Sequence, residues 1–337
     1  MATVAIDLHG GDFGPSLLIP ACFQFFREQP SHQGILVGDL KQFRSVVQHC
    51  PSNIDWLDKP ALGDAAKRPA RLLKRQANSS IESCFELVKQ GQADVLVSAE
   101  HTGVLLVLTT KYGQVHPFLK RPALVSAIPT VKEPCLMLDL GASYTAKTAQ
   151  LLAFSAIGTS LASAIKQKPS LALLNVGVEA FKGPIELQRA AEQLANWKDI
   201  DFKGYVEACD IYSGDYDIVI CDGFSGNHVI KSAEGSMALS SQLLSDRLNQ
   251  NYLNKFLGLW FKKQMKAALK PLDPANYNGA VVAGSDLAVV KSHGNARSKA
   301  FNSALVKALA LCQQQSVVAI QQKLDQVAND QKGVITG

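Results

Sequence analysis

Short apolar segments that end in glycine turns recur along this chain, and this recurrence constrains its fold more than any other feature. The clearest segment is 217–231, DIVICDGFSGNHVIK, in which an apolar run leads into Asp222-Gly223 and then into a new apolar pattern. Such a segment indicates a strand buried on both faces, a tight turn and the start of a helix. Similar strands are predicted at 4–7, 35–37, 95–99, 123–128, 136–139, 171–176, 218–221 and 280–283.

Helical patterns separate many of these strands, for example at 80–89, 147–166 and 188–197. Alternating strands and helices predict an α/β protein: a three-layer αβα sandwich with a mainly parallel sheet, in a single domain over residues 1–330. In such sheets, ligands bind where the carboxyl ends of strands and the amino ends of helices converge. We therefore expect the functional loops to gather at one carboxyl edge of the sheet.

The composition is that of a globular protein with a substantial core. Of 337 residues, 47% are hydrophobic and 19% are charged, and the net charge of +5 does not by itself indicate a nucleic-acid partner. The seven cysteines are widely spaced and include no C-x-x-C pair, so we expect neither a zinc site nor a disulfide framework. We expect no metal and no other cofactor. With no signal-peptide pattern and no run of about 18 apolar residues, a cytoplasmic protein is expected.

Residues 233–272 interrupt the alternation of strands and helices. They carry a helical pattern without a strand signal, which predicts a helical hairpin that protrudes from the body. Between Arg247 and Leu272 there is no acidic residue, and basic residues surround an aromatic and apolar group. Such a segment suits an anionic membrane surface, although a dimer interface or a solvated helix remains an alternative. The candidate membrane-contact residues are Leu257, Leu259, Trp260, Phe261, Lys262 and Lys263.

Several strand ends carry residues suited to binding an anion. Paired glycines after the first strand allow backbone N–H groups to approach an anion closely, although simple turn chemistry is the alternative. Ser98 and Thr102-Gly103 form an anion pocket or only a helix cap. Lys182 follows Asn175 in a glycine-bounded loop, where it can serve as a point charge for phosphate or remain solvated. His293-Gly294 suits phosphate or a pantetheine-like group, or is an ordinary turn.

A covalent mechanism finds no support in the sequence. There is no G-x-S-x-G elbow, no H-E-x-x-H motif and no cysteine beside a histidine in a catalytic context. The remaining chemistry is the positioning of an anion together with electrostatic stabilisation.

Taken together, these segments resemble the bacterial phosphate acyltransferase PlsX family from residue 4 to about residue 312. The segments that carry the resemblance are AIDLHGGDFGP, NSSIESCFELVKQGQADVLVSAEHTG, RPALVSAIPT, LDLGASYTAK, LLNVGVEAFKG, FKGYVEACDIYSGDYDIVICDGFSGN and VVKSHGNARSKAF. The resemblance implies a fold like that of phosphotransacetylases and isocitrate dehydrogenases. It implies a homodimer that transfers a long-chain acyl group from acyl carrier protein to inorganic phosphate for phospholipid synthesis. It also implies peripheral membrane association through the hairpin.

The resemblance implies catalytic roles for Lys182 and Asn227. Phosphate would attack the thioester carbonyl, with Lys182 stabilising the oxyanion and Asn227 orienting the reactants. The resemblance and the turn patterns together give a set of residues expected to bind phosphate or other parts of the substrate. This set is Asp7, Gly10, Gly11, Asp12, Ser98, Thr102, Gly103, Lys147, Asn175, Asp222, His293 and Gly294.

The chain departs from the family pattern at several of these turns. Glu100-His101 replaces Gly-Asn, Ser143 and Thr145 replace Asn and Asp, and Gln76-Ala77 replaces a basic pair. A carboxylate at Glu100 would repel phosphate unless His101 or Lys147 pairs with it. Two alternatives therefore stay open: a catalytically lapsed scaffold that binds acyl carrier protein or membrane, and a phosphotransacetylase-like enzyme that uses an acyl-coenzyme A.

Overall fold

An 11-stranded mixed sheet forms the centre of the computed structural model, which describes residues 1–39, 41, 43, 49–74, 78–248 and 273–335. The strands lie in the order β3-β2-β1-β4-β11-β10-β5-β6-β9-β7-β8. Their bounds are β1 Thr3–Asp7, β2 Gln33–Gly38, β3 Ile54–Asp58, β4 Val95–Ser98, β5 Ala123–Ile128, β6 Cys135–Leu138, β7 Ser170–Leu174, β8 Asp201–Val206, β9 Ile218–Ile220, β10 Ala280–Ala283 and β11 Val289–Lys291. Most neighbouring strands are parallel, so the prediction of a mainly parallel sheet is confirmed.

The direction of the strands reverses near the middle of the sheet. β10 is antiparallel to both β11 and β5, and β6 is antiparallel to β5. Strands β1, β4 and β11 therefore point one way, while β6, β9 and β7 point the other way. The expectation of a single carboxyl edge is wrong, because the carboxyl ends of the two halves lie at opposite edges of the sheet.

Helices cover both faces of the sheet, as a three-layer sandwich requires. The helices are α1 Pro15–Glu28, α3 Ser80–Lys89, α4 Thr102–Tyr112, α5 Thr148–Ser163, α6 Ile185–Leu194, α7 Gly223–Leu248, α9 Ser298–Gln313 and α10 Ser316–Ile335. One core contains Phe26 of α1, Phe154 of α5 and Phe301 of α9, and the other contains Phe85 of α3 and helix α4 residues. Alternate residues of β1 enter the two cores, as expected for a strand buried on both faces.

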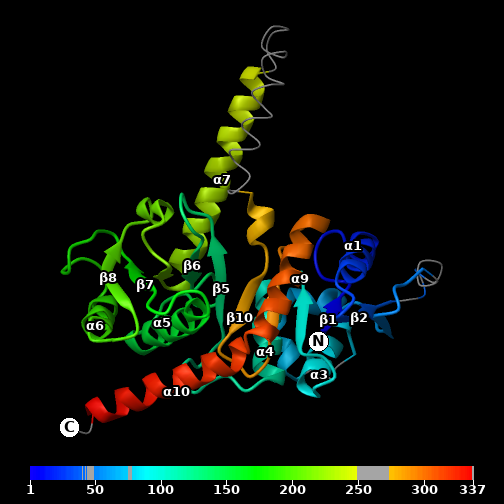
Figure 1. Cartoon of the computed structure of the whole chain (residues 1–337), viewed down its shortest axis with the longest axis horizontal. Coiled ribbons are helices and arrows are strands. Elements are labelled where there is room, and N and C mark those ends of the chain that lie inside the picture. Colours follow the sequence, from blue (N-terminus) through cyan, green and yellow to red (C-terminus); the bar gives the residue numbers. More distant parts are fainter. Residues whose placement is uncertain (40, 42, 44–48, 75–77, 249–272, 336–337) are drawn as a thin grey trace.

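Helix α7 protrudes from this body. It starts at the carboxyl end of β9, runs along the sheet and extends well beyond it (Figure 1). Residues 233–247 are mostly exposed. Helix α7 begins at Gly223, ten residues before the predicted hairpin of 233–272, and residues 249–272 lie outside the described part of the chain, so the hairpin stays a prediction. The candidate membrane-contact residues Leu257, Leu259, Trp260, Phe261, Lys262 and Lys263 lie outside the described residues. No single described helix is long and apolar enough to cross a membrane; only α9 and α10 together meet that requirement, with a bend of 61° between them.

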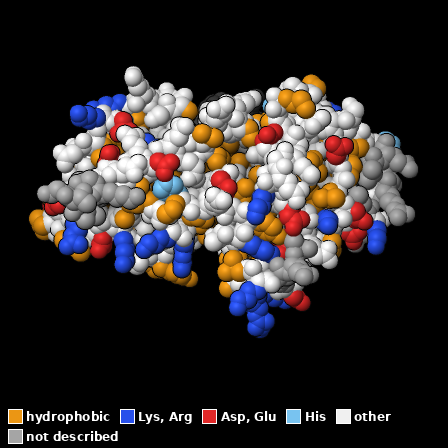
Figure 2. All heavy atoms as spheres, turned by 90° about the horizontal axis from the view of Figure 1, so that it is seen from below, with side chains coloured by type: hydrophobic (Ala, Val, Ile, Leu, Met, Phe, Trp, Pro, Cys, Tyr) orange, Lys and Arg blue, Asp and Glu red, His pale blue; other side chains and the backbone are white. Residues whose placement is uncertain are grey.

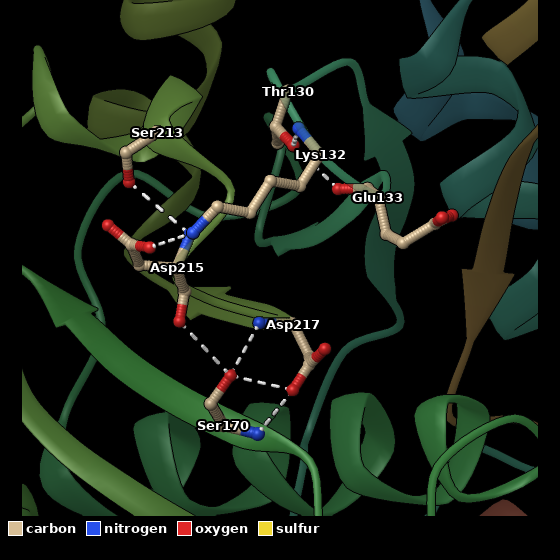
Figure 3. A network of polar contacts seen from close by, with 7 residues as sticks. All are labelled: Thr130, Lys132, Glu133, Ser170, Ser213, Asp215 and Asp217. Atoms are coloured by element: carbon tan, nitrogen blue, oxygen red, sulfur yellow. Dashed lines mark hydrogen bonds and ion pairs between the residues drawn. The ribbon is translucent and has the colours of Figure 1, made fainter.

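A polar network holds the amino ends of β7 and β9 (Figure 3). Lys132 in the turn after β5 forms an ion pair of 2.5 Å with Asp215, and Ser170 Oγ donates to the Asp217 carboxylate at 2.6 Å. The hydroxyl of Thr130 donates to the Glu133 carbonyl at 2.6 Å and closes the same turn. These contacts fix one end of the two strands, whose other end carries predicted site residues.

Candidate active site

A pocket of about 540 Å³ lies between α7 and the middle of the sheet. This volume is within the range of small-molecule sites. Strand β5, helix α7, the start of α4, the segment 274–280 and the end of β11 contribute to its wall. Much of the wall is apolar and includes Leu124, Ile128, Leu140, Ile230, Met237 and Tyr277. The polar and charged side chains that line it are Thr102, Ser126, Asn227, Lys231, Glu234, Ser241, Lys291 and His293.

Asp222 and Gly226 set the path of α7 past the sheet. Ser225 donates to the Asp222 carboxylate through its backbone N–H at 2.9 Å and its hydroxyl at 2.8 Å, so Asp222 caps the first turn. A Cβ at Gly226 would lie 2.1 Å from the Asp139 carbonyl oxygen, so only glycine permits this close approach. The helix consequently starts against the turn after β6 and carries Asn227 into the pocket.

The buried carboxylate of Asp139 organises that turn. It accepts hydrogen bonds from Leu124 N at 3.0 Å, Ser143 N at 2.7 Å and Ser143 Oγ at 2.8 Å. Ser143 Oγ in turn accepts from Gly223 N at 3.0 Å. Burial raises the pKa of Asp139, and these hydrogen bonds oppose the rise. Ser143 therefore joins the turn after β6 to the start of α7. Asp139 positions this turn, and it was not among the residues predicted from the sequence.

The turns after β1, β4 and β11 come together, as predicted. Asp7 accepts from Ser80 Oγ at 2.6 Å and from Ser98 Oγ at 2.7 Å, and both serines are buried. Asp12 N donates to the Gly294 carbonyl at 2.8 Å. A Cβ at Gly11, where φ is 83°, would lie 2.7 Å from the same carbonyl, and a Cβ at Gly10 would lie 2.7 Å from the backbone nitrogen of Glu100. The two glycines thus allow three turns to pack, and Asp7 holds them with hydroxyl partners.

Thr102 and His293 are the predicted residues from these turns that reach the pocket. Thr102 starts α4, whose first backbone N–H groups have no partner within the helix. Asn278 fixes the other turn, because its Oδ1 accepts from His293 N at 2.9 Å and its Nδ2 donates to Ser292 Oγ at 2.8 Å. Burial, with the positive charge of Lys291, lowers the pKa of His293. Its imidazole is therefore neutral near pH 7 and can both donate and accept a hydrogen bond.

Glu100 lies beside the pocket rather than in its wall. Its carboxylate accepts a hydrogen bond from His101 N at 2.8 Å, so the partner of Glu100 is a backbone N–H group. Burial raises the pKa of Glu100, while the nearby His101 and Lys291 lower it. Glu100 thus adds an acidic group close to the cationic end of the pocket.

Lys182, Asn175 and Lys147 lie on the second half of the sheet and are not part of the pocket wall. Lys182 sits in the loop after β7, at the edge opposite to the glycine turns of β1, and its ammonium pairs with Glu179 at 2.8 Å. Asn175 Nδ2 donates to the Lys182 carbonyl at 3.1 Å and shapes this loop. Lys147 caps α5. The predicted grouping of Lys182 with the glycine turns is therefore wrong within one chain, because the strands reverse.

Apolar side chains are exposed at this same edge. Tyr144 follows β6, Val176 and Phe181 follow β7, and Phe224 follows β9, and each is more than half exposed. We call these four residues the apolar edge. Seen from below, the molecule carries apolar side chains in small groups between charged and polar ones (Figure 2).

Lys291 and Lys231 are the cations that the sequence reasoning missed. Both line the pocket, and Lys231 is paired with Glu234 at 2.6 Å. Lys291 ends β11 directly before the Ser292-His293 turn, so its position at a strand terminus was a readable signal. Within the described ranges, no cluster of three or more His, Cys, Asp or Glu side chains is suited to a metal ion.

Comparisons with solved structures show the class of fold to which this chain belongs. A branched-chain phosphotransacylase from Enterococcus faecalis V583 superposes with a TM-score of 0.57 at 15% identity, over 93% of this chain and 99% of that one. The EutD phosphotransacetylase from Staphylococcus aureus superposes with a TM-score of 0.54 at 14% identity, over 96% and 94%. At such identity these likenesses show the fold alone, and they confirm the predicted phosphotransacetylase-like architecture.

The family follows from sequence comparison. Residues 2–319 match the family model described as "Fatty acid synthesis protein", and the chain belongs to this family. A phosphate acyltransferase from Shewanella sp. (strain MR-4) is 36% identical over 335 residues, which are 97% of this chain and 98% of that one. One from Moritella marina is 37% identical over 330 residues, which are 96% and 98%. The predictions of a PlsX-family protein and of an acyltransferase are confirmed.

Proposed function

We propose that this enzyme transfers a long-chain acyl group from the thioester of acyl carrier protein to inorganic phosphate. The product, an acyl phosphate, would enter phospholipid synthesis. The observation that carries the proposal is the make-up of one pocket, which joins an extended apolar wall to a group of polar and cationic side chains. Acyl transfer to phosphate agrees with the names of the family relatives.

The pocket has the length along α7 that a long acyl chain needs. Pocket residues on α7 run from Asn227 to Ser241, a rise of about 21 Å at 1.5 Å per residue. A bilayer core of about 30 Å holds two layers of acyl chains, or about 15 Å for one chain. Met237 and Ala238 line the pocket near its Ser241 end. A short acetyl group would leave most of it empty, which favours a long-chain donor over acetyl-coenzyme A.

The reaction needs a positioned nucleophile and little acid catalysis. A phosphate oxygen attacks the thioester carbonyl carbon, the tetrahedral intermediate collapses, the carbon–sulfur bond breaks and the phosphopantetheine leaves as a thiolate. Thiolates are good leaving groups because their conjugate acids have pKa values near 8.5. In this proposal the backbone N–H groups at the start of α4 and the Asn227 amide stabilise the negative charge that develops.

We propose that the enzyme works as a homodimer and that the partner covers the apolar edge. Exposed apolar surface of this kind is typical of protein–protein contacts. A symmetric contact at this edge would bring the Lys182 loop of one protomer toward the other protomer. Lys182 keeps its proposed catalytic role in this arrangement, acting across the interface on the acyl oxyanion.

We further propose a cytoplasmic enzyme that rests on the membrane surface through residues 257–263. The basic and aromatic composition of this segment motivates the proposal. Cosedimentation with phosphatidylglycerol vesicles tests it: Trp260→Ser with Phe261→Ser should stay in the supernatant at a vesicle concentration that pellets the wild type. Equal pelleting of the two proteins would remove the segment from membrane contact.

One assay tests the reaction and separates the alternatives. The protein is mixed with palmitoyl-acyl carrier protein or acetyl-coenzyme A, with and without phosphate, and thiol release is followed. We expect phosphate-dependent release from the carrier protein. Release from acetyl-coenzyme A alone would indicate the coenzyme A enzyme, and release from neither would indicate the lapsed scaffold that Glu100 motivates.

A further inference from the structure

Lys291 is held by the sheet at the cationic end of the pocket. It is the last residue of β11 and is in register with Ser98, the last residue of β4, on one side and with Ala280 of β10 on the other. Helix α4 begins four residues after Ser98, at Thr102, which lines the same pocket. The backbone of Lys291 is held between two paired strands, so its ammonium group stays within reach of the pocket.

The charge of Lys291 is not neutralised by a carboxylate in contact with it. Its ammonium donates to the Ser292 carbonyl at 3.1 Å, and no acidic oxygen of the described residues lies within ion-pair distance of it. Lys231, the other lysine in the wall, pairs with Glu234. Glu100 attracts Lys291 electrostatically from further away. Of the two pocket lysines, Lys291 is therefore the one whose charge is available to a ligand.

Burial makes this arrangement costly while the pocket is empty. Loss of hydration lowers the pKa of Lys291, and the nearby positive charge of Lys231 lowers it further. A partly buried ammonium without a counter-charge is destabilising, and an anion that enters the pocket removes that cost. The groups that face it from the neighbouring elements are Glu100, Lys231 and His293.

We infer that Lys291 binds the phosphate nucleophile in this pocket, between the amino end of α4 and the neutral imidazole of His293. This inference rests on the proposed function for the identity of the anion. It divides the work between two lysines: Lys291 holds phosphate within its own protomer, and Lys182 acts on the acyl oxyanion. Lys291 is thereby assigned as a residue that contacts substrate.

The test compares two lysines that are both partly buried. Lys291→Met keeps the length of the side chain and removes its charge. Lys307→Met is the matched control, because burial also lowers the pKa of Lys307, on α9, but this residue does not line the pocket. Phosphate binding to each protein is measured by titration calorimetry without an acyl donor, and by thermal unfolding in phosphate and in chloride of equal ionic strength.

We expect Lys291→Met to weaken phosphate binding by about ten- to a hundredfold, the range for one lost hydrogen bond to a charged group. In chloride the same variant should unfold at a higher temperature than the wild type, because an unpaired buried charge is gone. Lys307→Met should bind phosphate like the wild type. In the transfer assay, Lys291→Met should raise the KM for phosphate more than the KM for the acyl donor.

Three results would overturn the assignment: wild-type phosphate affinity in Lys291→Met, equal weakening in Lys307→Met, or no phosphate binding by the wild type. If Lys291→Met does not fold, Lys291→Gln replaces it under the same criteria. The wild-type affinity should also fall as pH rises through the lowered pKa of Lys291, at a pH below 10.5. Phosphate binding without thiol release would refute the proposed reaction and leave the role of Lys291 standing.

Discussion

At the scale of single residues, the balance of charge around the pocket decides how well an anion binds. Glu100 is the acidic group whose charge acts on Lys291. Its carboxylate partly cancels the field of the lysine. We expect Glu100→Gln to lower the KM for phosphate by about three- to tenfold, because an interaction of about 1 kcal/mol corresponds to about fivefold.

The pH dependence follows from the sign of the shift in Glu100. Its pKa is raised in the folded protein, chiefly by burial, so its charged form costs stability, and this cost appears as pH rises from 4.5 through the folded pKa. Glu100→Gln should therefore be more stable than the wild type at neutral pH and equally stable below 4.5. Thermal unfolding across this range measures the difference. A constant difference at every pH would contradict this origin.

Asn227 offers a second test at this scale. Its side chain lines the pocket from an exposed position on α7, so its loss should leave the fold intact. We expect Asn227→Ala to lower kcat by about 100- to 1,000-fold, the range for one lost oxyanion donor. The control is His228→Ala, which removes the next side chain, an exposed ring that packs on Phe224 outside the pocket. Similar losses in both variants would point to damage to α7 instead.

At the scale of elements, α7 links the two halves of the site. It starts under the turn that Asp139 and Ser143 hold, and it reaches the pocket end at which Lys291 and His293 lie. The sequence located this strand–turn–helix unit because an apolar run, two glycines and an amphipathic start are all local signals. Asp139 was missed because its partner Leu124 comes from another strand, and because Asp139 is joined to Gly223 only through Ser143.

The outer strands show a second limit of local patterns. β3 and β8 were not predicted, because they lie at the two ends of the sheet and contain exposed and partly exposed residues, so they do not form continuous apolar runs. The predicted strands within the sheet are continuous apolar runs, which are recognisable without knowing their neighbours. The reversal of the sheet between β5 and β6 leaves no such mark on the sequence, so the separation of Lys182 from the glycine turns was not foreseeable.

The position of α7 in the pocket wall also predicts how the enzyme responds to the length of the acyl chain. Ala238→Trp places a large ring in the pocket near its Ser241 end. We expect the KM for a palmitoyl donor to rise about tenfold or more, because overpacking costs about 1–3 kcal/mol, while an octanoyl donor is little affected. Leu239→Trp is the control, since Leu239 is exposed and does not line the pocket. Equal kinetics of Ala238→Trp with both donors would show that the acyl chain lies elsewhere.

At the scale of the whole molecule, a sheet with two carboxyl edges separates the proposed catalytic groups. Lys291 lies with the glycine turns at one edge, whereas Lys182 lies with exposed apolar side chains at the other edge, where α7 and its residue Asn227 begin. A dimer through the apolar edge resolves this separation if Lys182 serves the other protomer. Catalysis would then require two copies of the chain.

Mixing two inactive variants tests that arrangement. Lys182→Ala and Asn227→Ala are each expected to be nearly inactive. After subunit exchange at equal concentrations, half of the dimers are mixed and each mixed dimer has one intact site, so about a quarter of the wild-type activity should return. The amount of mixed dimer is measured with a tag on one variant. Exchange without recovery, or an active Lys182→Ala protein, would remove Lys182 from catalysis across the interface.

The most direct measurement is phosphate-dependent thiol release from palmitoyl-acyl carrier protein, with the acyl product identified by mass. With the wild type we expect acyl phosphate and free carrier thiol in equal amounts. With Asn227→Ala we expect the rate to be lower by about 100-fold or more. Thiol release that does not depend on phosphate, or that yields free fatty acid, would contradict acyl transfer to phosphate in the pocket beside α7.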